Sequence, residues 1–426
     1  MRITNYGNKI IRMRRRTYNK YAIVLLTLLI NKALLAQASP FVMEDYSFVS
    51  KQFNNIELFG SEEKYKKLYE KMDNMLLSGL GQVNIVHFGG SHVQADVWPN
   101  RTRYHFQKLM PGAAGPRGFL FPYKMAKTNN PSHFEVEYTG NWESCRNVEK
   151  NKNCLLGLSG ISVTTKDTAT TIRIIFPKDP TQSYYHKKVK IFHHLTDSSY
   201  NIYPLNREAY KELSDTITGL SEFIFEQPGQ ILEFEIRKTR ENQNYFTLFG
   251  ISFENDEAGF TYSSIGVNGA TVSSYNRCNL LPAQIKVLKP DLVVFSIGIN
   301  DAYDPDFTAD KYLQNYDTLV SNIKASCPDA AILFTTNTDS YYKRRYPNKR
   351  AFEVREVMIK LAEKHGAGVW DMFNLMGGLG SIKEWGKQGL AKKDLIHMTH
   401  EGYQLMGDLM YNAMLKSYIQ YSVGKP

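Results

Sequence analysis

The stretch KPDLVVFSIG, Lys289–Gly298, has an unbroken apolar centre between a proline and a glycine. Such a run is typical of a strand that is buried on both faces of a parallel sheet. A helical pattern follows over residues 309–325, and a second apolar strand, AAILFTT, occupies residues 330–336. Strands that alternate with helices predict layers of helix on both faces of a sheet. We therefore predict an α/β fold with a doubly wound parallel sheet.

The same alternation continues in both directions along the chain. Downstream we expect a helix over residues 351–366, a strand over 367–373 and a last helix after Glu401. Upstream, the apolar run VNIVHF (Val83–Phe88) ends at two glycines, and residues 96–110 have helical character. This order of strand, tight turn and helix predicts that the upstream segment belongs to the same α/β unit.

Between residues 126 and 255 the pattern changes. Leu232–Arg237, LEFEIR, alternates apolar and charged residues, as a half-buried strand does. Further strands are expected at residues 170–176, 187–192, 222–226 and 245–253. These short strands predict an inserted β-sandwich. The expected domains are a signal peptide (1–38), the first part of the α/β domain (39–125), the inserted β-rich domain (126–255) and the second part of the α/β domain (256–426).

The net charge of +10 comes mainly from the N-terminal segment. Eight of the 52 basic residues and none of the 42 acidic residues lie in residues 1–38, so charge gives no argument for a nucleic-acid partner. The segment has basic residues, then the apolar run Ala22–Ile30, then Ala36-Gln37-Ala38, which predicts a signal peptide. The apolar run is far shorter than the ~20 residues that span a bilayer. We expect a periplasmic or secreted protein without a stable membrane span, and leave open whether the signal is cleaved.

The four cysteines allow three fully paired arrangements, which an exported protein would tolerate. Cys145 and Cys154 lie close together in a polar, loop-like stretch and are the expected pair. Cys278 and Cys327 lie near apolar helical segments, where buried thiols are expected.

The stretch FGGSHVQAD, Phe88–Asp96, places a serine where a strand gives way to a helix. A serine hydroxyl becomes a nucleophile when a nearby base takes its proton, and the resulting oxyanion needs fixed hydrogen-bond donors. The N–H of Ser91 would point out at the positive end of the helix, where it could serve as such a donor. Taken alone, a serine at this position is more often a helix cap.

Two further stretches offer oxyanion donors. SSIGVNGATVSSY (Ser263–Tyr275) contains glycines, including Gly269, that let the backbone approach a ligand, although by itself it indicates only a turn. SIGIND (Ser296–Asp301) follows the best predicted strand, at the end of the sheet where open α/β folds place their sites. Asn300 could donate its side-chain amide; capping of the next helix is an equally good explanation.

Near the C-terminus, DLIHMTHEGY contains Asp394 and His397 three residues apart. One helical turn would bring their side chains to the same side, where the carboxylate would fix the tautomer of a basic imidazole. His400 raises the alternative of a metal site made by Asp394, His397 and His400, but no other pair with ligand spacing supports it.

In this order, the four stretches resemble the SGNH/GDSL hydrolase family. Its members carry a nucleophilic serine after Gly-Asp, a glycine in a second block, GxND in a third and DxxH in a fifth. The matching residues are Ser91, Gly269, Asn300 and the pair Asp394 and His397. The resemblance covers residues 80–125 and 256–418, and not the sequence of the insertion.

Two residues beside Ser91 qualify this resemblance. Gly90 replaces the family's aspartate, so we expect a looser turn at the serine; that aspartate does not transfer protons, and the triad is unaffected. His92 gives the sequence GSH, which together with GVNGA and an inserted β domain is similar to bacterial peptidoglycan O-acetylesterases.

The resemblance implies a serine esterase without metal or organic cofactor, in which Asp394 orients His397, His397 deprotonates Ser91, and Ser91, Gly269 and Asn300 hold the oxyanion. Its expected substrate is an O-acetylated glycan, and its oligomeric state stays open.

Two alternatives remain: an O-acyltransferase with the same triad, and a non-catalytic glycan-binding protein whose SGNH domain has degenerated. Glycan could stack on Trp142, Tyr184 or Tyr185, although ordinary packing explains them better. The basic stretch YYKRRYPNKR (Tyr341–Arg350) could bind an anionic wall polymer or be a solvated loop.

Overall fold

The structure is a computed structural model. It describes residues 39–42, 46–109, 111, 113–177 and 184–424. The predicted signal peptide, residues 1–38, lies outside the described residues. Within the described ranges, no helix has both the length and the apolar character needed to cross a membrane.

The main unit, Glu44–Pro426, contains a six-stranded sheet in the order β1-β19-β16-β15-β2-β14. The strands are β1 (Ile56–Leu58), β2 (Gln82–Gly89), β14 (Gly259–Gly266), β15 (Leu292–Ser296), β16 (Ala331–Thr335) and β19 (Gly368–Trp370). All neighbouring strands are parallel except β1, which runs antiparallel to β19 at the edge. The predicted α/β class and parallel sheet are confirmed, with β1 as an additional antiparallel strand.

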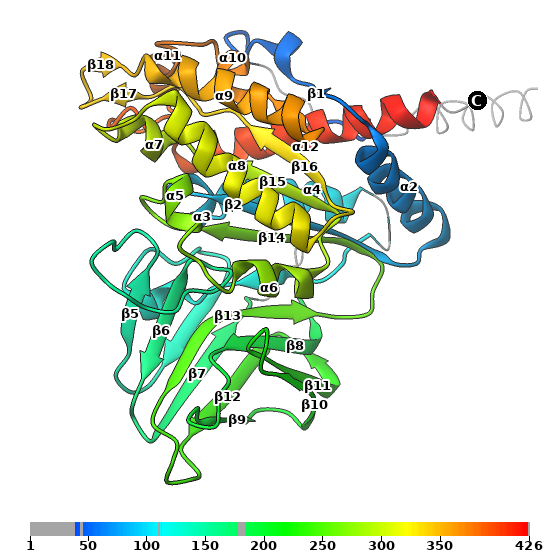
Figure 1. Cartoon of the computed structure of the whole chain (residues 1–426). Helices are drawn as coiled ribbons and strands as arrows, with labels where there is room; N and C mark the ends of the chain where they lie inside the picture. The colour runs from blue at the N-terminus through cyan, green and yellow to red at the C-terminus, as the bar shows by residue number, and fades with distance from the viewer. Residues whose placement is uncertain (1–38, 43–45, 110, 112, 178–183, 425–426) are drawn as a thin grey trace, which may run out of the picture. The chain divides into compact units, whose positions relative to one another are not determined.

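Helices cover both faces of this sheet, as Figure 1 shows. The long helices are α2 (Glu63–Ser78), α4 (Val97–Lys108), α8 (Ala309–Ser326), α9 (Arg350–His365) and α12 (His400–Val423). Successive residues of a strand point to opposite faces. Leu292 of β15 lines a small apolar cavity with residues of α2 and α12, whereas Phe295 lies 5.8 Å, centroid to centroid, from Tyr316 of α8. The continuously apolar run is therefore explained by burial on both sides.

Shorter elements connect these layers. They are α3 (Ser91–Gln94), α5 (Val272–Tyr275), α6 (Leu281–Ile285), α7 (Ile299–Tyr303), α10 (Met372–Leu375), α11 (Ile382–Lys387), the 3-10 turns η1 (Lys51–Phe53), η2 (Tyr123–Ala126) and η3 (Lys286–Leu288), and the hairpin β17 (Tyr341–Tyr342) and β18 (Tyr346–Pro347).

The chain between β2 and β14 forms two antiparallel sheets. One has the order β10-β11-β8-β13-β6-β5, with β3 also paired to β13, and the other has the order β4-β7-β12-β9. The strands are β3 (Gly118–Leu120), β4 (Glu135–Tyr138), β5 (Glu143–Arg146), β6 (Ile161–Thr165), β7 (Ala169–Ile175), β8 (His186–His193), β9 (Asn201–Pro204), β10 (Ala209–Asp215), β11 (Leu220–Gly229), β12 (Ile231–Arg237) and β13 (Phe246–Glu254). All five predicted strands are present.

One apolar core joins the two sheets. In β12, Leu232, Phe234 and Ile236 are buried, whereas Glu233 and Glu235 point outward. Phe176, which follows β7, packs edge to face on Phe253 of β13, with ring centroids 4.9 Å apart. This packing is consistent with the inserted β domain. The boundaries at residues 126 and 255 stay predictions; β3 already joins the larger sheet at Gly118.

The cysteine prediction is confirmed for the first pair. Cys145 and Cys154 form a disulfide, and Cys278 is a buried free thiol. Cys327 is also free but only partly buried.

The three aromatic residues considered for glycan binding differ in exposure. Trp142 and Tyr184 are buried, and Trp142 packs on Phe246. Tyr185 is 51% exposed. For Trp142 and Tyr184, ordinary packing is the better explanation.

Candidate active site

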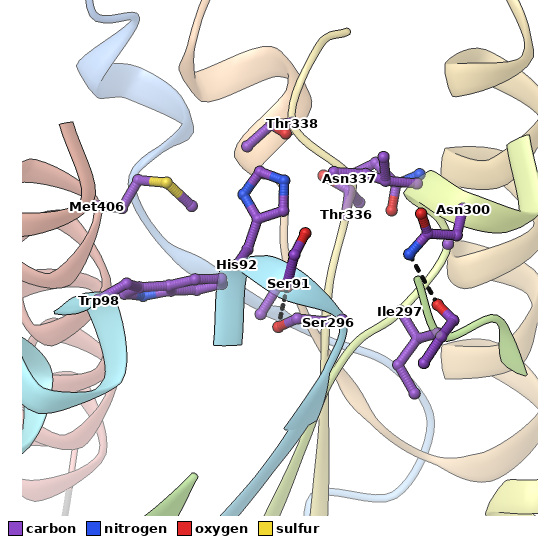
Figure 2. A pocket seen from close by; sticks show the side chains of 15 residues that line it. Ser91, His92, Trp98, Ser296, Ile297, Asn300, Thr336, Asn337, Thr338 and Met406 are labelled. Atoms are coloured by element: carbon purple, nitrogen blue, oxygen red, sulfur yellow. Dashed lines mark hydrogen bonds between the residues drawn. The ribbon is translucent and has the colours of Figure 1, made fainter. Parts of the chain in front are cut away.

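The predicted site residues gather at the carboxyl ends of three adjacent strands. Ser91 begins α3 directly after β2, and Asn300 lies in α7 directly after β15. The segment Thr336–Thr338 follows β16 and lines the same cavity. Ends of parallel strands meet at one edge of a sheet, so segments distant in sequence converge here. Figure 2 shows Ser91, Asn300 and this segment around the cavity.

The turn before Ser91 requires a glycine. A Cβ atom added to Gly89 would lie 2.2 Å from the Val93 side chain, because α3 turns back over the end of β2. The carbonyl of Gly90 accepts hydrogen bonds from the N–H groups of Val93 and Gln94, at 3.2 and 3.0 Å. These bonds fix the turn without an aspartate at position 90. A Cβ on Gly90 would also lie only 3.1 Å from Nδ2 of Asn300.

A chain of hydrogen bonds links Ser91, His397 and Asp394. Oγ of Ser91 lies 2.9 Å from Nε2 of His397, and Nδ1 of His397 lies 2.9 Å from Oδ2 of Asp394. The first of these contacts joins residues 306 positions apart in the sequence. The structure thus brings together all three residues of the predicted triad.

The local geometry of Asp394 and His397 differs from the expected helical turn. The segment is a loop in which Leu395 has a φ of 56°, and α12 begins only at His400. Oδ1 of Asp394 accepts hydrogen bonds from the N–H groups of Ile396 and His397, both at 2.9 Å. This side-chain turn, rather than a helix, places the carboxylate beside the imidazole.

Asp394 determines which ring nitrogen of His397 carries the proton. Burial alone would raise the pKa of Asp394, but hydrogen bonds from the His397 backbone and ring and from Ile396 lower it below its usual value. An ionised carboxylate only accepts hydrogen bonds, so Nδ1 of His397 must be the protonated nitrogen. Nε2 then presents its lone pair to the hydroxyl of Ser91, which is the arrangement of a general base.

The three predicted oxyanion donors lie close to this pair. Within the described part of the chain, the N–H groups of Ser91 and Gly269 donate no hydrogen bond. Nδ2 of Asn300 donates to the carbonyl of Ala270 at 2.9 Å, which leaves its second N–H free. Ser91, Ala270 and Asn300 line the cavity, and Gly269, with a φ of +84°, directly precedes Ala270.

Two side chains that are not among the predicted site residues hold the loop around Gly269. Oε1 of Gln94, in α3, accepts the Asn268 N–H at 2.7 Å. The carboxylate of Asp301 accepts the Val272 N–H at 3.1 and 3.2 Å, and its burial raises its pKa to about 7. Gln94 lies three residues after Ser91, so its position one helical turn away was the available sequence signal.

His92 packs directly on His397. Their rings are stacked with centroids 5.3 Å apart, and Nδ1 of His92 lies 3.2 Å from the Tyr403 hydroxyl. Burial, and then electrostatic interaction with the neighbouring His397, lower the pKa of His92 to about 3, so this ring is neutral. Among the described residues, Nε2 of His92 has no hydrogen-bond partner. His92 therefore adds a neutral support beside the imidazole of His397.

The cavity itself is small, about 30 Å³. A water-sized group needs about 10–15 Å³ on this measure, so the cavity holds about two such groups. Trp98 of α4 and Met406 of α12 provide apolar walls, and Figure 2 shows both on the side of His92. The space next to Ser91 is therefore comparable in size to a short acyl group.

The alternative metal site is not assembled in the residues that the structure describes. No group of three or more His, Cys, Asp or Glu side chains is placed to hold a metal ion there. His400 is exposed at the start of α12, and Asp394 is directed to His397.

The order of the sheet, the helices on both faces and the inserted antiparallel sheets define the SGNH hydrolase fold. A solved structure of a peptidoglycan O-acetylesterase superposes with a TM-score of 0.68 at 20% identity, covering 86% of this chain and 99% of that one. A GDSL-like lipase from Parabacteroides merdae (TM-score 0.29, 18% identity, 36% and 72% covered) and the acetyl xylan esterase AlAXEase (0.30, 18%, 36% and 81%) are also similar.

Residues 240–405 match the family described as GDSL-like Lipase/Acylhydrolase. This match includes Gly269, Asn300, Asp394 and His397, and it ends short of Ser91 toward the N-terminus. This partial family match and the shared fold both support the predicted resemblance to SGNH/GDSL hydrolases. A search of curated protein sequences found no match.

Proposed function

We propose that the protein is an exported serine esterase that removes O-acetyl groups from a cell-wall or extracellular glycan, one acetyl ester at a time. The observation that carries this proposal is the hydrogen-bonded chain from Ser91 through His397 to Asp394. Export rests on the predicted signal peptide.

In the proposed reaction, Nε2 of His397 takes the hydroxyl proton as Oγ of Ser91 attacks the ester carbonyl. The N–H groups of Ser91 and Gly269 and the free N–H of Asn300 hold the oxyanion. When the intermediate collapses, His397 returns the proton to the leaving sugar oxygen. Water, deprotonated by His397, then releases acetate from Ser91, and the ionised Asp394 stabilises each imidazolium that forms.

Two observations support an acetyl ester on a glycan. The cavity beside Ser91 has space for about two water-sized groups, which suits an acetyl group. The solved structure that shares the fold over 86% of this chain is a peptidoglycan O-acetylesterase. Peptidoglycan is therefore the proposed substrate.

The substrate proposal predicts a steep dependence on acyl length. Activity with p-nitrophenyl acetate should exceed activity with the octanoate ester by about a hundredfold, since forcing extra methylenes into a close-packed site costs about 1–3 kcal/mol of strain. Acetate release from O-acetylated peptidoglycan and from acetylated xylan should be compared in the same assay. A preference for long acyl chains, or for xylan, would contradict the proposed substrate.

The two alternative functions, an O-acyltransferase and a non-catalytic glycan-binding protein, are tested by separate experiments. Transfer of acetyl to an added glycan in place of free acetate would indicate the transferase. Failure of a fluorophosphonate to label Ser91 would indicate the degenerate binding protein.

Replacing Asn300 by alanine should lower kcat about a hundredfold with little change in KM, because one oxyanion donor acts mainly in the transition state. The same change removes the bond to the Ala270 carbonyl. Steady-state kinetics with p-nitrophenyl acetate measure the effect. An unchanged kcat would remove Asn300 from the oxyanion site.

A further inference from the structure

The hairpin β17–β18 carries a cluster of cations that the proposed reaction does not use. Its turn consists of Lys343, Arg344 and Arg345, all exposed, which we call the hairpin cations. Within the described residues, none of the three forms an ion pair. Tyr346, the next residue, is 64% exposed. The hairpin thus presents free positive charge beside an accessible aromatic ring.

This hairpin is attached to the loop that holds the triad. The Tyr341 N–H donates to the carbonyl of Leu395 at 2.9 Å, and Leu395 lies between Asp394 and His397. The Tyr303 hydroxyl, from α7, donates to the carbonyl of Tyr341. The base of the hairpin is therefore anchored to the triad loop and to α7, and the hairpin cations begin two residues after this anchor.

The triad loop itself adds two lysines. Lys392 and Lys393 are exposed, and the Lys392 N–H donates to the His397 carbonyl at 2.8 Å. The charge of Lys392 reaches the site: burial is the main cause of the low pKa of His92, and Lys392 contributes to it. These two residues, the loop lysines, directly precede Asp394 and add positive charge to the loop that holds the triad.

The nearby acidic groups do not neutralise this charge. The carboxylate of Asp394 is bonded to His397 and Ile396. Asp304 and Asp306 follow α7, and the Asp304 carboxylate accepts the Asp306 N–H at 3.0 Å. Neither forms an ion pair with the hairpin cations or loop lysines in the described ranges.

We propose that the hairpin cations and the loop lysines form a binding surface for a carboxylate-bearing glycan strand whose ester lies at Ser91, with Tyr346 available to pack on a sugar ring. The cations attract the carboxylates of a peptide-substituted glycan, and neutral glycans such as xylan lack these groups. This inference rests on the proposed function and assigns recognition of the anionic polymer to a specific part of the chain.

The test is the triple variant Lys343→Asn, Arg344→Asn, Arg345→Gln. Lys343 and Arg344 have φ values of 52° and 59°, and asparagine tolerates this conformation, so the turn should persist. At low ionic strength, KM for soluble O-acetylated peptidoglycan fragments should rise about tenfold while kcat is retained. Added salt should raise the wild-type KM toward that of the variant. Kinetics with neutral p-nitrophenyl acetate should not change.

A matched control removes three other exposed cations, by Lys108→Gln, Lys360→Gln and Lys416→Gln on α4, α9 and α12. The net charge changes equally, and KM for the fragments should stay at the wild-type value. An equal rise in both variants would show a general charge effect and overturn the proposal. An unchanged KM in the hairpin variant, with p-nitrophenyl acetate still hydrolysed, would overturn the proposal and leave the esterase assignment intact.

Sedimentation with insoluble peptidoglycan tests the surface independently of catalysis. Wild type should bind peptidoglycan more than chitin, a neutral glycan, and the hairpin variant should lose this difference. If no ester is hydrolysed, the proposed function fails, but this binding result still decides the inference. Loss of binding to phosphatidylglycerol vesicles, with unchanged binding to peptidoglycan, would instead assign the surface to a membrane and overturn the proposal.

Discussion

Replacing Ser91 with alanine is expected to lower kcat for p-nitrophenyl acetate about a millionfold, the effect of removing the nucleophile from a serine hydrolase. Oγ of Ser91 lies 2.9 Å from Nε2 of His397, and without it the imidazole has no hydroxyl to deprotonate. The residual rate would come from the oxyanion donors and from substrate binding. Steady-state kinetics, with thermal unfolding to establish that the variant is folded, measure the effect.

Ser296→Ala is the matched control for this variant. Ser296 lines the same cavity, but its hydroxyl lies 2.6 Å from both Nε2 of His87 and Oγ1 of Thr335, so it is not presented to His397. This variant should retain most of its activity. If Ser91→Ala kept near-normal turnover, or if Ser296→Ala abolished it in a folded protein, Ser91 would not be the nucleophile.

The strands of the parallel sheet could be predicted because burial on both faces demands continuous apolar sequence. β15 and β16 lie within their predicted ranges. Helix α8 begins where predicted and ends one residue later, and α9 begins and ends one residue earlier than predicted. β1 could not be predicted in this way. This strand has three residues, with Glu57 exposed at its centre. Three residues are too few to show the alternation of apolar and polar side chains that identifies a strand.

The chemistry of the site was easier to predict than its geometry. Residue types and their order indicated the triad, whose catalytic role stays a prediction. The expected helical turn at Asp394 was wrong, because spacing alone did not reveal the left-handed conformation of Leu395. The bond from Asn268 to Gln94 joins residues 174 positions apart, so it depends on tertiary packing that no local pattern records.

The second large effect is expected for Asp394→Asn, which should lower kcat about ten-thousandfold with little change in KM. The asparagine oxygen can keep the hydrogen bonds from the Ile396 and His397 N–H groups, which directs its NH₂ group at Nδ1 of His397. Nδ1 must then accept, so the proton moves to Nε2 and the base facing Ser91 is lost. Steady-state kinetics at neutral pH measure this effect.

Asp301→Asn provides the matched control, since it changes a nearby carboxylate that contacts Val272 and not the imidazole. It should retain far more activity than Asp394→Asn. Equal losses in the two variants would contradict the conclusion that Asp394 sets the tautomer of His397.

The pH dependence of stability gives a second test of Asp394. Because hydrogen bonds lower the pKa of Asp394 despite its burial, its ionised form stabilises the fold above about pH 4, and this contribution disappears as the pH falls through the folded-state pKa. Between pH 6 and pH 3, Asp394→Asn should therefore lose less Tm than wild type, whereas an equal loss would show that the fold does not hold this carboxylate in its ionised form.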